Sequence, residues 1–143
     1  MKKNKKKVMV FGTFDYFHSG HENLFEQAKK LGDYLIVIVA RDETVKMIKG
    51  ENPQYAEKKR LKTVEEHPLA DKAVLGELDD KYKVIRKWKP DIIALGYDQF
   101  VFTYRLEKII IDAKLNTEIH RLNPYKPEIF KSSLMKKNNP SLE

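Results

Sequence analysis

Residues 8–21 have the sequence VMVFGTFDYFHSGH. The first four residues are apolar and predict a buried strand, and the turn residues from Gly12 onward separate it from an amphipathic helix expected over residues 20–31. Ser19 and Glu22 have the spacing of a capping box, so we expect Ser19 to cap this helix. A strand that passes through a short turn into a helix is the first half of a βα unit.

Strand and helix patterns alternate along the rest of the chain. Apolar runs predict strands over residues 8–12, 34–40, 72–75, 91–96 and 118–122. Helical patterns lie over residues 20–31, 42–48, 56–67, 81–88 and 103–115. Such alternation requires right-handed crossovers and a parallel sheet covered by helices on both faces. We therefore expect a single-domain, doubly wound, Rossmann-like α/β fold, in which ligands bind beyond the carboxyl ends of the strands.

The composition restricts the class of protein. The chain has 143 residues, no cysteine and a formal net charge of +7. Its length suits one domain, which we place at residues 1–135, ahead of a frayed tail at residues 136–143. We find no transmembrane run and no signal peptide, and expect a cytoplasmic protein without a membrane partner. A basic surface attracts phosphate-rich ligands, whether nucleotides, metabolites or nucleic acid.

Two histidines, His18 and His21, stand where the first strand meets the first helix. A helix N-terminus presents unpaired N–H groups and a partial positive charge, which stabilise a bound phosphate. The imidazoles can add hydrogen bonds, and Gly20 lets a polyphosphate approach the backbone because it has no Cβ. Ordinary loop histidines or a metal-binding pair are the alternatives. The His-x-Gly-His spacing at this junction favours phosphate binding.

The GTFD string at residues 12–15 and the HSGH string at residues 18–21 resemble the GTFD and HxGH motifs of the cytidylyltransferase-like nucleotidyltransferases. Members of that family transfer a nucleoside monophosphate from a nucleoside triphosphate to a phosphate-bearing acceptor and release pyrophosphate. The resemblance implies that the two histidines are catalytic and that Gly12, Thr13 and Phe14 line the nucleotide site. It also implies a homodimer, and Mg²⁺ that bridges the triphosphate oxygens without a metal site in the protein.

Basic residues after the second expected strand resemble the part of the family that contacts phosphate. We assign the catalytic lysine to Lys46, which lies in the first turns of the expected helix, and regard Lys49 as a solvated lysine. Arg60 resembles a family arginine that contacts the triphosphate or the acceptor phosphate. The alternative is that Arg60 and the lysines around it form a solvated basic face.

Two further motifs extend the resemblance. Gly96 and Asp98 occupy the place of a family Gly-x-Asp motif that lines the nucleotide site, and Gln99 beside them could orient ribose or base; turn chemistry alone would also explain Gly96. Ser132 and Ser133 resemble the closing motif that holds the phosphates from the other side, with helix capping as the alternative. Relatives that use glycerol phosphate carry an Arg-Thr-Glu-Gly-Ile-Ser-Thr-Thr string here, which this chain lacks.

Within the family, residues 40–45 and 96–99 look most like the archaeal-type FAD synthases, so transfer of AMP from ATP to FMN is the favoured reaction. A CTP-dependent enzyme acting on glycerol 3-phosphate or a similar small phosphate is the second choice. Outside this class, the net charge leaves open a basic nucleic-acid-binding module. We find no binding motif for it and expect no nucleic acid partner. A nucleotide sensor that has lost turnover is a third reading.

Overall fold

The computed structural model describes residues 5–80, 82–96 and 101–124, with the backbone alone for residues 101–104. Strands and helices alternate along these residues. The strands are β1 (Lys7–Gly12), β2 (Tyr34–Val39), β3 (Lys72–Leu75), β4 (Ile92–Leu95) and β5 (Glu118–Arg121). The helices are α1 (Ser19–Lys29), α2 (Asp42–Lys49), α3 (Glu57–Glu65), α4 (Lys83–Trp88) and α5 (Val101–Asp112). The expected strands and helices are therefore confirmed, with shifts of a few residues at their ends.

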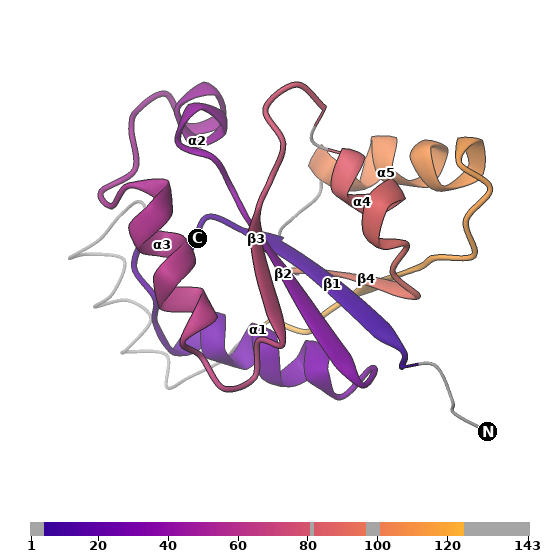
Figure 1. Ribbon diagram of the computed structural model, residues 1–143. Helices are drawn as coiled ribbons and strands as arrows, with labels where there is room; N and C mark the ends of the chain where they lie inside the picture. The colour runs from indigo at the N-terminus through magenta and orange to yellow at the C-terminus, as the bar shows by residue number, and fades with distance from the viewer. Residues whose placement is uncertain (1–4, 81, 97–100, 125–143) are drawn as a thin grey trace.

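The five strands form one parallel sheet in the order β3-β2-β1-β4-β5 (Figure 1). β1 lies at the centre and pairs with β2 along its whole length, from Lys7 opposite Tyr34 to Gly12 opposite Val39. The chain runs outward from β1 to β3, then returns to β4 on the other side of β1. This reversal places the topological switch point at the carboxyl ends of β1 and β4, where doubly wound sheets bind ligands. The expected doubly wound α/β fold is confirmed.

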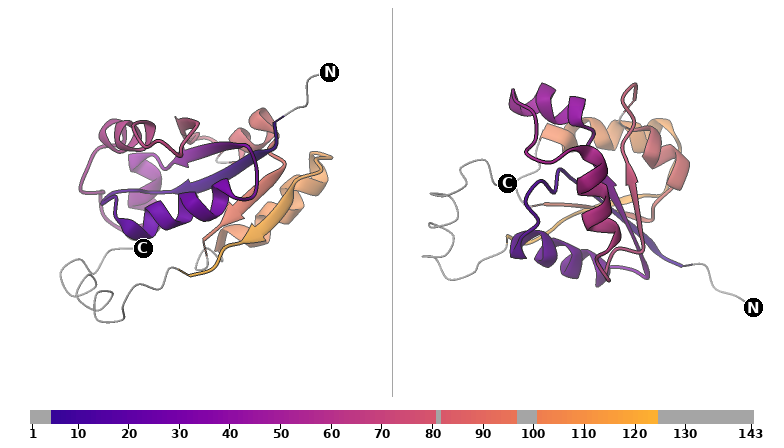
Figure 2. Two further views of the ribbon diagram at one scale, coloured as in Figure 1. Left: turned by 90° about the horizontal axis from the view of Figure 1, so that it is seen from below. Right: turned by 60° about the vertical axis from the view of Figure 1, so that its left-hand side comes forward.

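Helices cover both faces of the sheet (Figure 2). On one face, Phe25 of α1 and Val64 of α3 pack with alternate strand residues such as Val10 in one buried cluster. On the other face, residues of α4 and α5 pack with Met9 and Ile36 in a second cluster. The alternation of Met9 and Val10 between the two clusters is the period of two that strands impose. Burial on both faces explains why the central strands are almost continuously apolar.

The cap of α1 differs from the expectation. His18, not Ser19, is the N-cap residue, because its Nδ1 atom accepts a hydrogen bond from the backbone N–H of Gly20 over 3.0 Å. His21 completes the box by accepting from the backbone N–H of His18. The expected Ser19–Glu22 pair was one residue too late, because two imidazoles take the roles that hydroxyl and carboxylate groups usually take in such boxes.

In the described part of the chain, no helix has both the length and the apolar character needed to cross a membrane. The boundary expected between residues 135 and 136 lies outside the described residues.

Candidate active site

The loop after β1 is held in a strained backbone conformation. Phe14 has a φ of 57°, a left-handed value that is rare for a residue with a bulky side chain. Its ring is buried, with 1% of the residue exposed, and lies 5.0 Å from the ring of His21 and 5.6 Å from that of Phe25. A Cβ atom on Gly12 would stand 2.6 Å from Cζ of Phe14. Gly12 is therefore required by the buried ring two residues later.

The cap of α1 orients both site histidines. Their rings stack with centroids 4.0 Å apart and planes 27° from parallel. Because the Nδ1 atom of each ring accepts a backbone hydrogen bond, the proton of each neutral imidazole belongs on Nε2. The N-terminus of α1 thus carries two imidazole N–H donors in addition to its own backbone N–H groups.

His21 is neutral in this environment. Burial, followed by the electrostatic effects of His18 and Lys49, lowers its pKa from 6.5 to about 3. Its Nε2 atom is buried and makes no hydrogen bond to any of the residues that the structure describes. A buried donor without a partner costs about 1–3 kcal/mol, and a phosphate oxygen placed there would remove that cost. His21 is thus poised as a donor to an anion.

Helix α2 carries two lysines that could reach the phosphates, Lys46 and Lys49, and both are exposed. Val45 is the buried residue of α2, and Lys49 lies four residues later on the same side of the helix. Lys46 lies about 100° around the helix from Val45. The charge of Lys49 contributes to the lowered pKa of His21. The assignment of the catalytic lysine to Lys46 stays a prediction, and Lys49 is a second candidate for the same role.

Arg60 lies inside the protein, with 1% of the residue exposed. Its guanidinium donates to the carbonyl oxygens of Tyr55 (2.9 Å), Thr13 (2.8 Å) and Ala40 (2.8 Å) and to the carboxylate of Asp42 (2.7 Å). The alternative of a solvated basic side chain is wrong for Arg60, because the residue is buried among four protein acceptors. The predicted phosphate contact stays a prediction. In the structure, Arg60 connects the loop after β1 to the end of β2 and to the first residue of α2.

The carboxylates of Asp15 and Glu57 stabilise the same region through hydrogen bonds to backbone N–H groups. Asp15 accepts hydrogen bonds from the backbone N–H groups of Gln54 (2.6 Å) and Tyr55 (2.8 Å), just before α3. Glu57 accepts from the backbone N–H of Asp42 over 2.8 Å. Asp15 is the last residue of the GTFD motif, and the motif alone predicts no role for it. Its role depends on Gln54 and Tyr55, which are about forty residues away in the chain, so no local pattern reveals it.

The structure describes three of the remaining predicted site residues. Thr13 is buried and gives its carbonyl oxygen to Arg60. Gly20 lies in the first turn of α1, and its N–H is used by the cap. Gly96 follows β4 at the same edge of the sheet, and its carbonyl accepts from Arg121 over 2.8 Å. The other four predicted residues lie outside the described residues and stay predictions: Asp98, Gln99, Ser132 and Ser133.

This edge of the sheet therefore combines a helix N-terminus, two imidazole donors and a lysine at the switch point of a doubly wound fold. A family model described as Cytidylyltransferase-like matches residues 9–139. The chain belongs to the cytidylyltransferase-like family. The resemblance inferred from the GTFD and HxGH motifs is confirmed.

Several curated members of the family are similar over most of their length. An FAD synthase of Picrophilus torridus is 41% identical over 127 residues, covering 89% of this chain and 91% of its own. An FAD synthase of Thermoplasma acidophilum is 40% identical over 131 residues, covering 92% of each chain. Among solved structures, a lipopolysaccharide core biosynthesis protein from Thermoplasma volcanium is 38% identical with a TM-score of 0.80, covering 85% of this chain and 99% of its own.

Proposed function

We propose that this member of the cytidylyltransferase-like family is an FMN adenylyltransferase, which transfers AMP from ATP to FMN and releases pyrophosphate. The similarity to FAD synthases over about nine-tenths of both chains supports the choice of substrates. The observation that carries the chemistry is the neutral, buried His21, whose Nε2–H stands beside His18 at the N-terminus of α1. Such donors bind triphosphate oxygens without a change of protonation.

In the proposed reaction, a phosphate oxygen of FMN attacks the α-phosphorus of ATP in line. The new P–O bond joins the two phosphates, the bond from the α-phosphorus to the β-phosphate oxygen breaks, and pyrophosphate leaves with the electron pair. A phosphate monoester is already anionic at neutral pH, so little deprotonation is needed. Alignment and charge stabilisation should therefore supply most of the rate enhancement.

Each site residue has a defined task in this scheme. His18 and His21 donate Nε2–H groups to oxygens on the reacting phosphates, and Lys49 adds a positive charge on the α2 side. Gly20 allows the phosphates to approach the backbone. Arg60 keeps α2 at a fixed distance from the loop after β1. These contacts bring two anions together and stabilise the charge that develops on the leaving pyrophosphate.

We propose that Mg²⁺ binds together with the triphosphate. Residues 5–80, 82–96 and 105–124 contain no group of three His, Asp or Glu side chains that could hold a metal ion. Mg²⁺ at nucleotide sites is held largely by phosphates and water, so we propose that the ion arrives bound to triphosphate oxygens. Bound in this way, the ion neutralises part of the phosphate charge.

The test is pyrophosphate release with Mg²⁺, measured for ATP and for CTP, each with FMN and with glycerol 3-phosphate, with the products identified by mass. ATP with FMN giving FAD is the expected result. CTP with glycerol 3-phosphate giving product would replace it with the second reaction. Absence of turnover with all four pairs would contradict both. Light scattering on the same preparation tests the predicted homodimer, and the predicted cytoplasmic location is tested by cell fractionation.

A further inference from the structure

A hollow of about 700 Å³ lies at the amino ends of the strands, at the edge of the sheet opposite the histidines. Lys7 opens β1 and Tyr34 opens β2, whereas Trp88 ends α4 and Asp91 directly precedes β4. A six-residue strand is roughly 20 Å long, so the hollow is separate from the proposed active site. Its residues play no part in the reaction described above.

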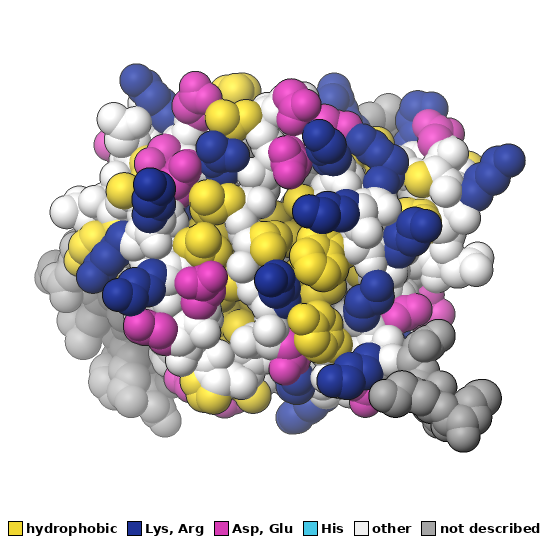
Figure 3. All heavy atoms as spheres, in the orientation of Figure 1, with side chains coloured by type: hydrophobic (Ala, Val, Ile, Leu, Met, Phe, Trp, Pro, Cys, Tyr) yellow, Lys and Arg dark blue, Asp and Glu magenta, His cyan; other side chains and the backbone are white. Residues whose placement is uncertain are grey.

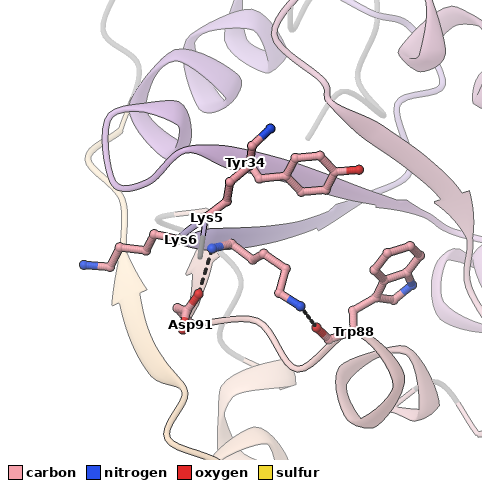
Figure 4. Close-up of a pocket in the computed structure, with 6 residues that line it drawn as sticks. Lys5, Lys6, Tyr34, Trp88 and Asp91 are labelled. Atoms are coloured by element: carbon pink, nitrogen blue, oxygen red, sulfur yellow. Dashed lines mark hydrogen bonds between the residues drawn. The ribbon is translucent and has the colours of Figure 1, made fainter. Parts of the chain in front are cut away.

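The hollow pairs aromatic rings with ammonium groups. Nζ of Lys5 lies 5.7 Å from the ring centroid of Tyr34, and Nζ of Lys87 lies 5.9 Å from that of Trp88. Nζ of Lys7 donates to the carbonyl oxygen of Trp88 over 2.7 Å, which holds a third charge beside the backbone of Trp88 (Figure 4). Each ring therefore has its own cation within about 6 Å, the range of a cation–π contact.

The charge of the hollow favours an anionic partner. Its lining contains three lysines and one carboxylate, Asp91. Asp91 accepts a hydrogen bond from the backbone N–H of Lys7 over 2.8 Å, and nearby Asp33 accepts from that of Lys6 over 3.0 Å. Figure 3 shows apolar side chains in the middle of one face of the molecule with many Lys and Arg side chains around them. A second copy of the chain would bring lysine against lysine here, which opposes self-association.

We propose that the hollow binds single-stranded nucleic acid, with bases stacked on Tyr34 and Trp88 and phosphates held by Lys5 and Lys87. Aromatic platforms set in a basic groove are how proteins bind single strands without sequence preference. Two rings, each with its own ammonium, match two successive nucleotides better than one free nucleotide. This proposal does not depend on the reaction proposed for the opposite edge.

The sequence alone does not predict this arrangement of aromatic and basic residues. Lys5, Tyr34 and Trp88 lie in three separate segments, so they form no recognisable nucleic-acid-binding motif, and we expected no such partner from the sequence. Parallel strands place all their amino ends at one edge of the sheet. The fold therefore brings residues together that are far apart in the chain.

Trp88 makes the hollow directly observable, because it is the one tryptophan in the sequence. The experiment titrates the full-length protein with oligothymidylate of about 12 nucleotides and follows tryptophan fluorescence. We expect saturable quenching. If two phosphates are neutralised, a roughly fourfold rise in salt should weaken binding about sevenfold. An unchanged signal at saturating oligonucleotide, or equal quenching by AMP alone, would overturn the proposal.

Matched variants separate this hollow from general attraction to a basic protein. Lys5→Gln with Lys87→Gln should weaken oligonucleotide binding about tenfold, measured by anisotropy of a labelled strand. Lys62→Gln with Lys108→Gln removes the same charge from exposed positions on α3 and α5 and should stay within about twofold of the parent. Equal losses in the two pairs would mean attraction to net charge only and would reject the site.

Two further variants test the stacking, and one assay tests independence. Tyr34→Leu and Trp88→Leu should each weaken binding of the labelled strand about tenfold while thermal unfolding stays cooperative. Full affinity in both folded variants would reject the stacking arrangement. Pyrophosphate release should be unchanged in all these variants. Activity lost in step with oligonucleotide binding would contradict two separate sites.

Discussion

The backbone N–H of His18 donates to Nδ1 of His21 over 3.4 Å, so the same bond that starts α1 also sets the tautomer of the buried imidazole. Nδ1 can accept only while His21 is neutral, which agrees with the lowering of its pKa to about 3. The cap and the chemistry of the site therefore depend on one another. A helix that began elsewhere would leave neither imidazole in place.

Replacing either histidine should remove catalysis while leaving the fold. For His18→Ala and His21→Ala we expect kcat to fall about 100- to 1000-fold, because each substitution deletes one donor to the reacting phosphates. Pyrophosphate release measures this. His120→Ala is the matched control, since His120 lies on β5 away from the site and pairs with Glu118. Normal turnover in His21→Ala would exclude His21 from the mechanism.

The free energy of unfolding should depend on pH in part because of His21. Below about pH 6.5 the unfolded chain binds a proton at this residue, whereas the folded protein does not until about pH 3. Since the unfolded state binds more protons in that window, stability should fall as the pH falls, by about 2 kcal/mol from pH 6.5 to pH 5.

Urea unfolding at several pH values checks this, with His21→Gln as the comparison. The variant should lose stability less steeply than the parent over the same window. Identical slopes for the two proteins would show that His21 is charged in the folded state.

Lys49 should matter for activity and Lys46 should not. Lys49→Ala should reduce kcat/KM about 10- to 100-fold, because it removes a positive charge that acts on His21, whereas Lys46→Ala should stay within about threefold. The pKa of His21, followed by NMR, should rise in Lys49→Ala only. The opposite ranking of the two variants would identify Lys46 as the catalytic lysine.

Arg60 should contribute mainly to stability. Arg60→Met leaves the carbonyls of Thr13 and Ala40 without their donor, and we expect the free energy of unfolding to fall by about 3 kcal/mol. Arg86→Met is the surface control. Arg86 pairs with Asp80 in an exposed ion pair, and its loss should cost less than about 1 kcal/mol. A large rise in KM with unchanged stability in Arg60→Met would instead indicate direct phosphate contact.

Gly12 should tolerate no side chain. Gly12→Ala places a Cβ atom 2.6 Å from the buried ring of Phe14, and we expect a loss of about 1–3 kcal/mol in denaturant unfolding together with lower activity. Gly76→Ala is a fair comparison, because its Cβ would meet Ile38 at an ordinary 3.6 Å. Equal stability of the two variants would show that the loop after β1 can rearrange.

The roles of some site residues can be predicted from their neighbours in the sequence, whereas the roles of others depend on distant contacts. His18, Gly20 and His21 are close in sequence and lie at one junction, so the chain itself indicates what they do. Arg60 was assigned to phosphate because it resembles a family arginine, and the lysines around it suggested a solvated face as the alternative. Its protein acceptors, on Thr13 and Ala40, come from distant segments that only folding brings together.

The sequence by itself determined the order of strands and helices, the parallel sheet and the motif that names the family, because hydrophobic period and short spacings are local properties. The tertiary structure decided that Lys49 lies on the Val45 side of α2, that Arg60 is buried and that Tyr34 and Trp88 line one hollow. Those outcomes depend on how α2 is rotated on Val45 and on which strand ends share an edge. Both are set by packing between segments that are not neighbours in the chain.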